Sequence, residues 1–140
     1  MLYPTRSVVY LNGAATVFEA YNKDGGNYFK LHDLAFALKG TNKQFAVFYN
    51  DAAKSIALIS GLPYMADGGE MAQGDGKATI AAPAELSIFI DGVKMDFNVY
   101  SIGGSILFKL RDLMKAIDVY VGYDTATKAI TINTSTGYTN

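Results

Sequence analysis

Hydrophobic and polar positions follow a pattern that predicts short strands, and the same pattern occurs twice along the chain. In each occurrence two extended runs flank a turn pair, Asn12-Gly13 in the first and Asp91-Gly92 in the second. Asn-Gly and Asp-Gly favour a two-residue hairpin, because both central residues of that turn need positive φ. Residues 95–99 then alternate apolar and polar side chains, which is typical of a strand with one buried face.

A short extended piece and a helix follow in each half. Apolar residues spaced i, i+3, i+4 and i+7 predict a helix with one buried face. Four residues in each segment have this spacing: Leu31, Leu34, Ala35 and Leu38 in the first, and Leu110, Leu113, Met114 and Ile117 in the second. Two further strands around a polar turn are predicted after each helix.

The two halves are similar in sequence as well as in pattern. Pairing residues 9–38 with 88–117, and 45–64 with 119–138, gives 16 identities in 50 positions. Average residue usage gives only about one match in fifteen. We therefore predict a duplication, with a first repeat at 1–64, a Gly-rich acidic linker at 65–86 and a second repeat at 87–140.

The expected fold class is α+β, built from two tandem β-β-(β)-α-β-β repeats. Each repeat would form an antiparallel sheet with one packed helix. A unit of this size buries too little surface to be stable alone, since even a domain of about 60 residues buries only about 60% of its unfolded surface. We therefore expect the two repeats to pack together or to exchange strands, in a pseudo-two-fold relation.

Composition excludes several classes of function. The chain has 140 residues, 50% of them hydrophobic, and a formal net charge of -1. It lacks the basic field of a nucleic-acid-binding protein. It has no cysteine for a disulfide or a thiolate metal site. No apolar run is long enough to span a membrane. The first residues lack a signal-peptide pattern, so secretion would require that such a peptide had been removed.

No catalytic, cofactor or metal site is predicted. His32 is the only histidine, and the matching residue is Arg111, which is a poor metal ligand. Asp33 and Asp112 fall in the first helical turn, where a carboxylate meets exposed N–H groups. The Gly pairs lack the Lys-Ser/Thr of a phosphate loop, and no partner histidine completes a serine triad. The chain is therefore expected not to be an enzyme and to bind no cofactor.

Tyrosines are the candidate ligand surface. Four of them recur at matching positions: Tyr21 with Tyr100, and Tyr64 with Tyr138. One interpretation is that these rings cover sheet edges or join the repeats. The other is that they form an exposed platform that stacks on sugar rings or holds a protein partner. The sequence leaves both interpretations open.

The duplicated motif resembles a known family. "NYFKLHDLAFAL" at 27–38 returns as "SILFKLRDLMKAI" at 105–117, and the hairpin turn, the aromatic–acidic turn and the final strand recur in the same order. This arrangement resembles the stalk-domain family, also called the copper amine oxidase N-terminal domain-like family. His32 and Phe48 depart from that pattern, which usually has Arg and Gly there. The second half has these residues, Arg111 and Gly122.

The resemblance implies an accessory module, common in tandem in exported and cell-wall proteins of Gram-positive bacteria. It does not imply copper binding, because the catalytic domain of the amine oxidases is absent from these repeats. We expect a non-catalytic spacer, scaffold or protein-interaction module that is secreted or cell-wall associated. Its candidate partners are a cell-wall polysaccharide or another envelope protein. The alternative is a glycan-binding module that uses the exposed tyrosines.

Overall fold

The computed structural model describes residues 3–23, 26–50, 52–65, 82–83, 85–97, 99–102, 105–124, 126–127 and 129–138. The elements of the first half are β1 (Tyr3–Leu11), β2 (Ala14–Lys23), β3 (Gly26–Lys30), α1 (Leu31–Leu38), β4 (Phe45–Asn50) and β5 (Ser55–Ser60). The remaining elements are β6 (Ala82–Pro83), β7 (Ser87–Ile90), β8 (Val93–Met95), β9 (Val99–Ile102), β10 (Ser105–Lys109), α2 (Leu110–Ala116), β11 (Tyr120–Tyr123) and β12 (Ile130–Asn133).

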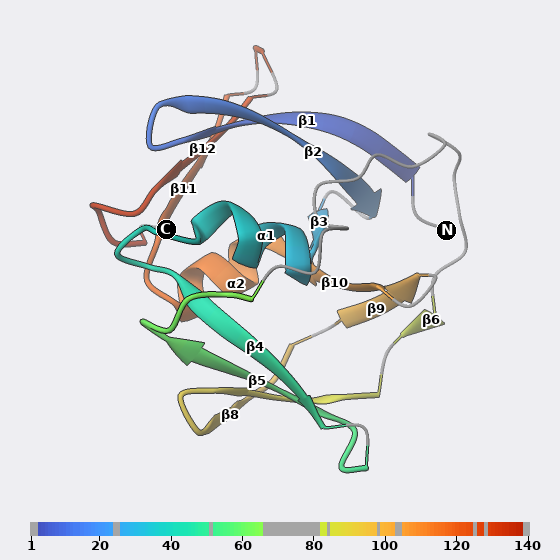
Figure 1. Ribbon diagram of the computed structural model, residues 1–140. Coiled ribbons are helices and arrows are strands. Elements are labelled where there is room, and N and C mark those ends of the chain that lie inside the picture. The colour runs from blue at the N-terminus through green and yellow to red at the C-terminus, as the bar shows by residue number, and fades with distance from the viewer. Residues whose placement is uncertain are drawn as a thin grey trace.

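The strands form two sheets with both helices between them. One sheet has eight strands in the order β11-β12-β1-β2-β3-β10-β9-β6, and the other has four in the order β4-β5-β7-β8. Figure 1 shows α1 and α2 in the middle of the molecule, with β1 and β2 on one side and β4, β5 and β8 on the other. The fold is therefore mixed α+β, and strands predominate.

Both sheets contain strands from both halves of the chain. β1 pairs in parallel with β12, and β5 pairs in parallel with β7; the other pairs among the described strands are antiparallel. The prediction of one antiparallel sheet with its own helix for each repeat is wrong in this respect. Each half adds its last hairpin to the first strand of the other half. The two ranges 1–64 and 87–140 are therefore interleaved in space.

The strand register recurs along the chain. Val9 pairs with Ile130, and Ile88, 79 positions after Val9, pairs with Ile56, 74 positions before Ile130. A shift of 79 positions turns the residue pairs of β1–β2 into those of β7–β8, and the pairs of β2–β3 into those of β9–β10. A shift of 74 positions turns the pairs of β4–β5 into those of β11–β12. In the antiparallel pair β3–β10, Phe29 lies opposite Phe108, its own counterpart.

The two predicted hairpin turns are confirmed. Asn12 and Asp91 have φ of 51° and 50°, and the glycines after them have φ of 87° and 82°. Each turn is also tied to the last strand of the other half. The Asn12 amide donates to Thr134 Oγ1 at 3.0 Å, and the backbone N–H of Thr134 donates to Asn12 Oδ1 at 2.9 Å. Ser60 donates to Asp91 from its N–H at 2.8 Å and from its hydroxyl at 2.7 Å.

The helices supply the centre of the core. All four apolar positions predicted for α1 are buried, and Leu110, Leu113 and Met114 of α2 are buried as well. Burying a Leu side chain fully contributes about 1.5–3 kcal/mol. Edge-on packing of Phe18 and Phe29, with ring centroids 5.2 Å apart, anchors the large sheet against the helices.

The predicted linker at 65–86 falls mostly outside the described residues. Within it the structure describes a two-residue strand, β6, which the sequence did not predict. β6 pairs with β9, so that Ala82 lies opposite Ser101. This end of the segment therefore belongs to the eight-stranded sheet.

Candidate functional site

Tyr21 and Tyr100, predicted from their matching positions, meet on the face of the eight-stranded sheet that points away from the helices. They belong to a small cluster made of five residues, here called the tyrosine cluster: Tyr21, Tyr28, Tyr100, Ile102 and Leu107. Tyr21 is only 7% exposed, whereas Tyr100 is half-buried. The Tyr28 and Tyr100 rings pack edge to face at 5.3 Å. This packing is that of a second small core rather than of an open platform.

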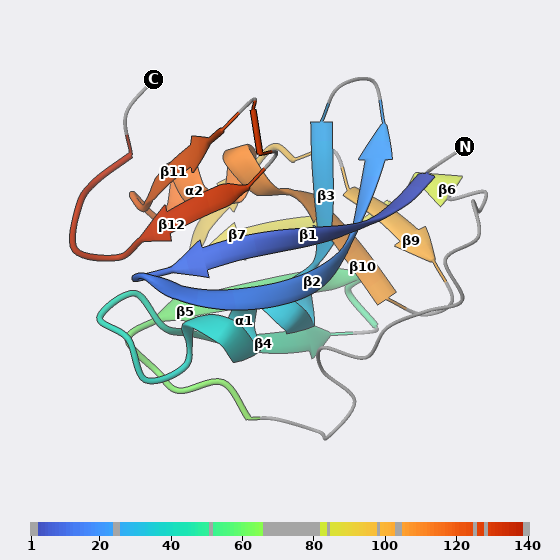
Figure 2. The ribbon, with the colours of Figure 1, turned by 90° about the horizontal axis from the view of Figure 1, so that it is seen from above.

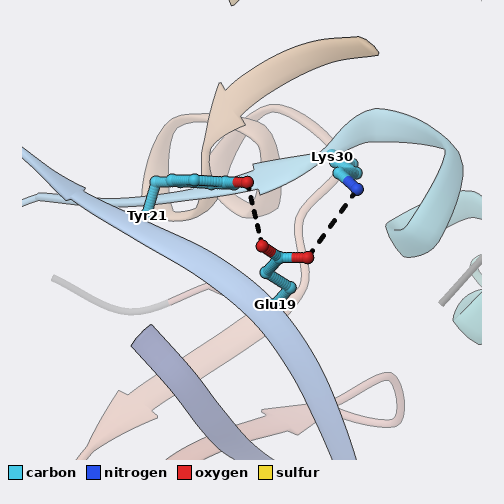
Figure 3. A network of polar contacts seen from close by, with 3 residues as sticks. All are labelled: Glu19, Tyr21 and Lys30. Carbon is cyan, nitrogen blue, oxygen red and sulfur yellow. Dashed lines mark hydrogen bonds and ion pairs between the residues drawn. The ribbon is translucent and has the colours of Figure 1, made fainter. Parts of the chain in front are cut away.

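Polar contacts hold the tyrosine cluster in place (Figure 3). The Tyr21 hydroxyl donates to Glu19 Oε1 at 3.0 Å, and Lys30 Nζ lies 4.0 Å from Glu19 Oε2. The Lys23 ammonium lies 5.6 Å from the centre of the Tyr100 ring. Glu19 is 5% exposed, and a buried carboxylate requires such partners. The Tyr21 hydroxyl is therefore committed to a structural contact.

Tyr64 lies elsewhere, in contact with the only histidine. Its hydroxyl is 2.6 Å from His32 Nδ1, and the Tyr49 hydroxyl is 2.6 Å from His32 Nε2. Tyr49 also stacks on the imidazole, with an interplanar angle of 12°. We call these three residues the histidine corner. Tyr64 is 3% exposed, so its ring is not accessible to a ligand.

Tyr138, the fourth predicted residue, is half-buried near the end of the described chain. Its backbone N–H donates to Asp118 Oδ1 at 3.0 Å. The structure therefore brings together Tyr21 and Tyr100, and gives Tyr64 and Tyr138 separate surroundings. Among the tyrosines with described side chains, the more exposed rings are those of Tyr10, Tyr49 and Tyr123.

A groove between residues of the two halves was not predicted by sequence reasoning. The β11 groove, as we call it, has a volume of about 430 Å³, within the range of small-molecule sites. Its walls come from the β2–β3 hairpin, the start of α2, and β11 with β12. The lining residues are Asn22, Gly26, Asn27, Lys109, Leu110, Arg111, Val121, Gly122, Tyr123 and Ile130.

The chemistry of the β11 groove is basic and polar on an apolar floor. Leu110, Val121 and Ile130 are buried, whereas Arg111 and Tyr123 are exposed. Within the described ranges neither of the two lining cations, Lys109 and Arg111, has a carboxylate within 4.0 Å. Two unpaired cations over an apolar floor can hold an anion through charge-assisted hydrogen bonds.

The histidine corner occupies the corresponding place in the first half. His32 matches Arg111, and Tyr49 matches Tyr123. The strand register is the same at both tyrosines, because Tyr49 pairs with Ile56 and Tyr123 pairs with Ile130. The imidazole and its two tyrosines contact one another there. Two exchanges in the sequence indicated the difference, namely Arg111 in place of His32 and Gly122 in place of Phe48. The sequence could not show that Asn22 and Asn27 lie beside Arg111, because that depends on tertiary packing.

Two carboxyl groups at turns have shifted titration. The backbone N–H and then the hydroxyl of Ser60 lower the pKa of Asp91 below its ordinary value. The backbone N–H groups of Ala126 and Thr127 likewise lower the pKa of Asp124. Both groups cap turns and lie outside the β11 groove lining. They are structural carboxylates rather than candidates for acid–base chemistry.

Comparison with known proteins adds no assignment. No protein-family model, curated protein or solved structure matches this chain. Within the described ranges, no group of three or more His, Cys, Asp and Glu side chains could hold a metal ion. The longest described helix has eight residues, and none of the described helices is long and apolar enough to cross a membrane.

Proposed function

We propose that this chain is a non-catalytic accessory module of the cell envelope, exported from a Gram-positive bacterium, that acts as a spacer, scaffold or interaction domain. The motifs shared with the stalk-domain family support the compartment. The architecture supports the mechanical role, because neither sheet can form from one half alone. The observation that carries the proposal is this exchange of strands between the halves.

The proposed architecture is a pair of tandem repeats related by a pseudo-two-fold axis through the centre of β3–β10. The recurring register supports it, since each pairing made by one half has a counterpart made by the other. The opposition of Phe29 and Phe108 supports the position of the axis. Two interleaved repeats share one core, so they should move as a single rigid body.

A spacer must also hold its neighbours apart. Figures 1 and 2 place the start of β1 and the described segment after β12 on opposite sides of the molecule. A chain that enters on one side of a rigid body and leaves on the other fixes the separation of whatever is attached to it. A rigid spacer loses little conformational entropy when its neighbours bind a partner.

Spin labels can test this rigidity in the intact chain, which has no native cysteine. Glu85 and Ser135 are exposed, and both can be replaced by cysteine. Double electron–electron resonance should give one narrow distance distribution. A broad or bimodal distribution would contradict the spacer role. Fractionation of the source cells with an antibody to the chain tests the compartment separately, and recovery in the cytosol would contradict export.

A glycan-binding module is the second candidate. Burial of Tyr21 and Tyr64 leaves Tyr100 and Tyr138 as the partly accessible members of the predicted set. The feature that favours this candidate is instead Tyr123, which is 47% exposed beside Arg111 in the β11 groove.

A further inference from the structure

We propose that the β11 groove binds an acidic glycan, a sugar chain that carries carboxylate or phosphate groups. The proposal extends the glycan-binding candidate to a defined site and ligand class. It does not depend on the spacer role, since a rigid module could hold its neighbours apart with or without this ligand.

The charge of the groove indicates an anion. Lys30, the counterpart of Lys109 in the first half, has Glu19 at 4.0 Å. The residue that matches Glu19 in the second half is Asn98, which carries no charge. Lys109 therefore lacks the acidic residue that its counterpart has. Arg111 adds a planar guanidinium, which binds carboxylate and phosphate through paired hydrogen bonds.

The remaining polar groups suit the hydroxyls of a sugar. Asn22 Nδ2 donates to Asn27 Oδ1 at 3.3 Å. Among the described residues no partner is found for the other two amide atoms, Asn22 Oδ1 and Asn27 Nδ2. Asn22 and Asn27 line the same groove as the two cations, and these atoms offer one acceptor and one donor, which is the pair that a hydroxyl needs.

An aromatic ring completes the site. Tyr123 lines the groove with nearly half of its surface exposed, so one face of a sugar ring can pack on it. An acidic peptide would use the two cations through its carboxylates, whereas a sugar in addition presents several hydroxyls to the amide pair and an apolar ring face to Tyr123. The combination of cations, amides and an exposed ring therefore favours an acidic glycan over an acidic peptide.

Calorimetric titration of the intact chain can test the proposal. The probes are trigalacturonic acid, which carries carboxylates, and a ribitol phosphate trimer, which carries phosphodiesters, with maltotriose as the neutral control. At least one acidic probe should bind, maltotriose should not, and affinity should fall with added NaCl. Which acidic probe binds identifies the source of the anion, and binding of either one supports the proposal.

Variants locate the site. Arg111→Gln and Lys109→Gln should each weaken binding by about tenfold or more, the effect of one hydrogen bond to a charged group. Lys94→Gln is the matched control, because Lys94 is an exposed lysine of β8 outside the groove. Tyr123→Phe should keep the affinity, whereas Tyr123→Ala should lower it severalfold. Circular dichroism must show that each variant is folded.

Four results would overturn the proposal. The first is that neither acidic probe binds. The second is an equal loss in Lys94→Gln and Arg111→Gln, which means non-specific charge attraction. The third is equal affinity for inorganic phosphate, which means an anion site without sugar recognition. The fourth is equal or tighter binding of hexaglutamate, which assigns the groove to an acidic peptide. None of these results would alter the spin-label distance that tests the spacer role.

Discussion

The histidine corner and the β11 groove occupy matching places in the two halves but differ in what their side chains do. In the first half, His32 joins Tyr49 and Tyr64 through both ring nitrogens. In the second half, Arg111 and Tyr123 line an open groove. The backbone pairing beneath them is the same. The side chains at these positions, together with the β2–β3 hairpin beside Arg111, turn one place into a structural contact and the other into a candidate binding site.

This difference shows that two halves with the same strand register can differ in side-chain chemistry. Register and turn geometry constrain the backbone of both halves in the same way. The side chains at the histidine corner and in the β11 groove are not constrained by that register, so one half can use them for stability while the other leaves them open for a ligand. The predictions below test whether the two halves contribute equally to stability at the paired strands, and unequally at the histidine corner and the β11 groove.

The largest change in stability is expected at β3–β10, where the two halves should contribute equally. Phe29→Ala and Phe108→Ala remove opposed, buried rings at the centre of β3–β10. Each should lower the free energy of unfolding by about 3–5 kcal/mol, because a large buried ring is replaced by a cavity. Urea unfolding followed by circular dichroism measures the loss, and tyrosine ring signals in NMR report on both halves.

Both halves should lose structure together in either variant, since each sheet contains strands of both. Separate unfolding of the first-half and second-half signals would contradict a shared core. Phe48→Ala is the control, because Phe48 is 53% exposed. Its effect should stay within about 0.5 kcal/mol.

The next largest change in stability is expected at His32 and Arg111, where the two halves should differ. His32→Ala removes hydrogen bonds to Tyr64 and Tyr49 and the ring that stacks on Tyr49, and each hydrogen bond contributes about 0.5–1.5 kcal/mol. Arg111→Ala removes an exposed side chain and should change stability by no more than about 0.5 kcal/mol. Thermal unfolding of both variants measures the contrast. Equal destabilisation would mean that Arg111 in the β11 groove stabilises the fold as much as His32 does in the histidine corner.

A smaller contrast concerns the two hairpin turns. Ser60 lowers the pKa of Asp91, whereas the matching residue, Asn12, does not titrate. Because the folded-state pKa is depressed, the stabilisation is complete above the unfolded-state pKa, near 3.8, and is lost as pH falls through the lower folded value. Asp91→Asn should therefore lose less stability in acid than the parent chain.

The reverse change, Asn12→Asp, should increase the acid-induced loss, because a carboxylate there would accept from Thr134 as Asp91 does from Ser60. Each effect should be below about 1 kcal/mol, since water screens an exposed group. Urea midpoints at pH 7 and pH 3 for the three proteins measure it. An identical acid loss in all three would show that these turns do not contribute to acid sensitivity.

The sequence predicted the parts of the fold that depend on neighbours in the chain. The two turns at Asn12 and Asp91 and the buried face of α1 follow from local geometry, and these predictions were correct. In the second helix Leu110, Leu113 and Met114 are buried as predicted, whereas Ile117 lies just past the end of α2 and is half-buried. The parallel pairs β1–β12 and β5–β7 join segments far apart in sequence, and no local signal specifies them. Packing and strand exchange were both expected as ways to join the two halves, and the structure shows strand exchange, so the separate antiparallel sheet predicted for each half does not form.

The candidate site was less predictable than the fold. The sequence predicted Tyr21 and Tyr100 only as candidate ligand residues at matching positions, and the fold brings them into one cluster. The sequence could not show that Tyr21 is buried there. Arg111 and Gly122 were visible as differences between the halves, but their role depends on the β2–β3 hairpin, which packs beside them only in the folded chain. Burial and groove formation are tertiary properties, and the pattern of one strand does not contain them.

The smallest effect is expected from removing only the tyrosine hydroxyl, at Tyr49 in the histidine corner and at Tyr123 in the β11 groove. Tyr49→Phe removes the contact with His32 Nε2 but keeps the stacked ring, so it should cost about 0.5 kcal/mol, as expected for an exposed hydrogen bond. Within the described chain the Tyr123 hydroxyl makes no hydrogen bond, so Tyr123→Phe should leave the melting temperature unchanged. Differential scanning calorimetry of the two variants measures the contrast. A loss of stability in Tyr123→Phe equal to that in Tyr49→Phe would mean that the Tyr123 hydroxyl also makes a stabilising contact across the β11 groove. The groove would then be available to a ligand only part of the time.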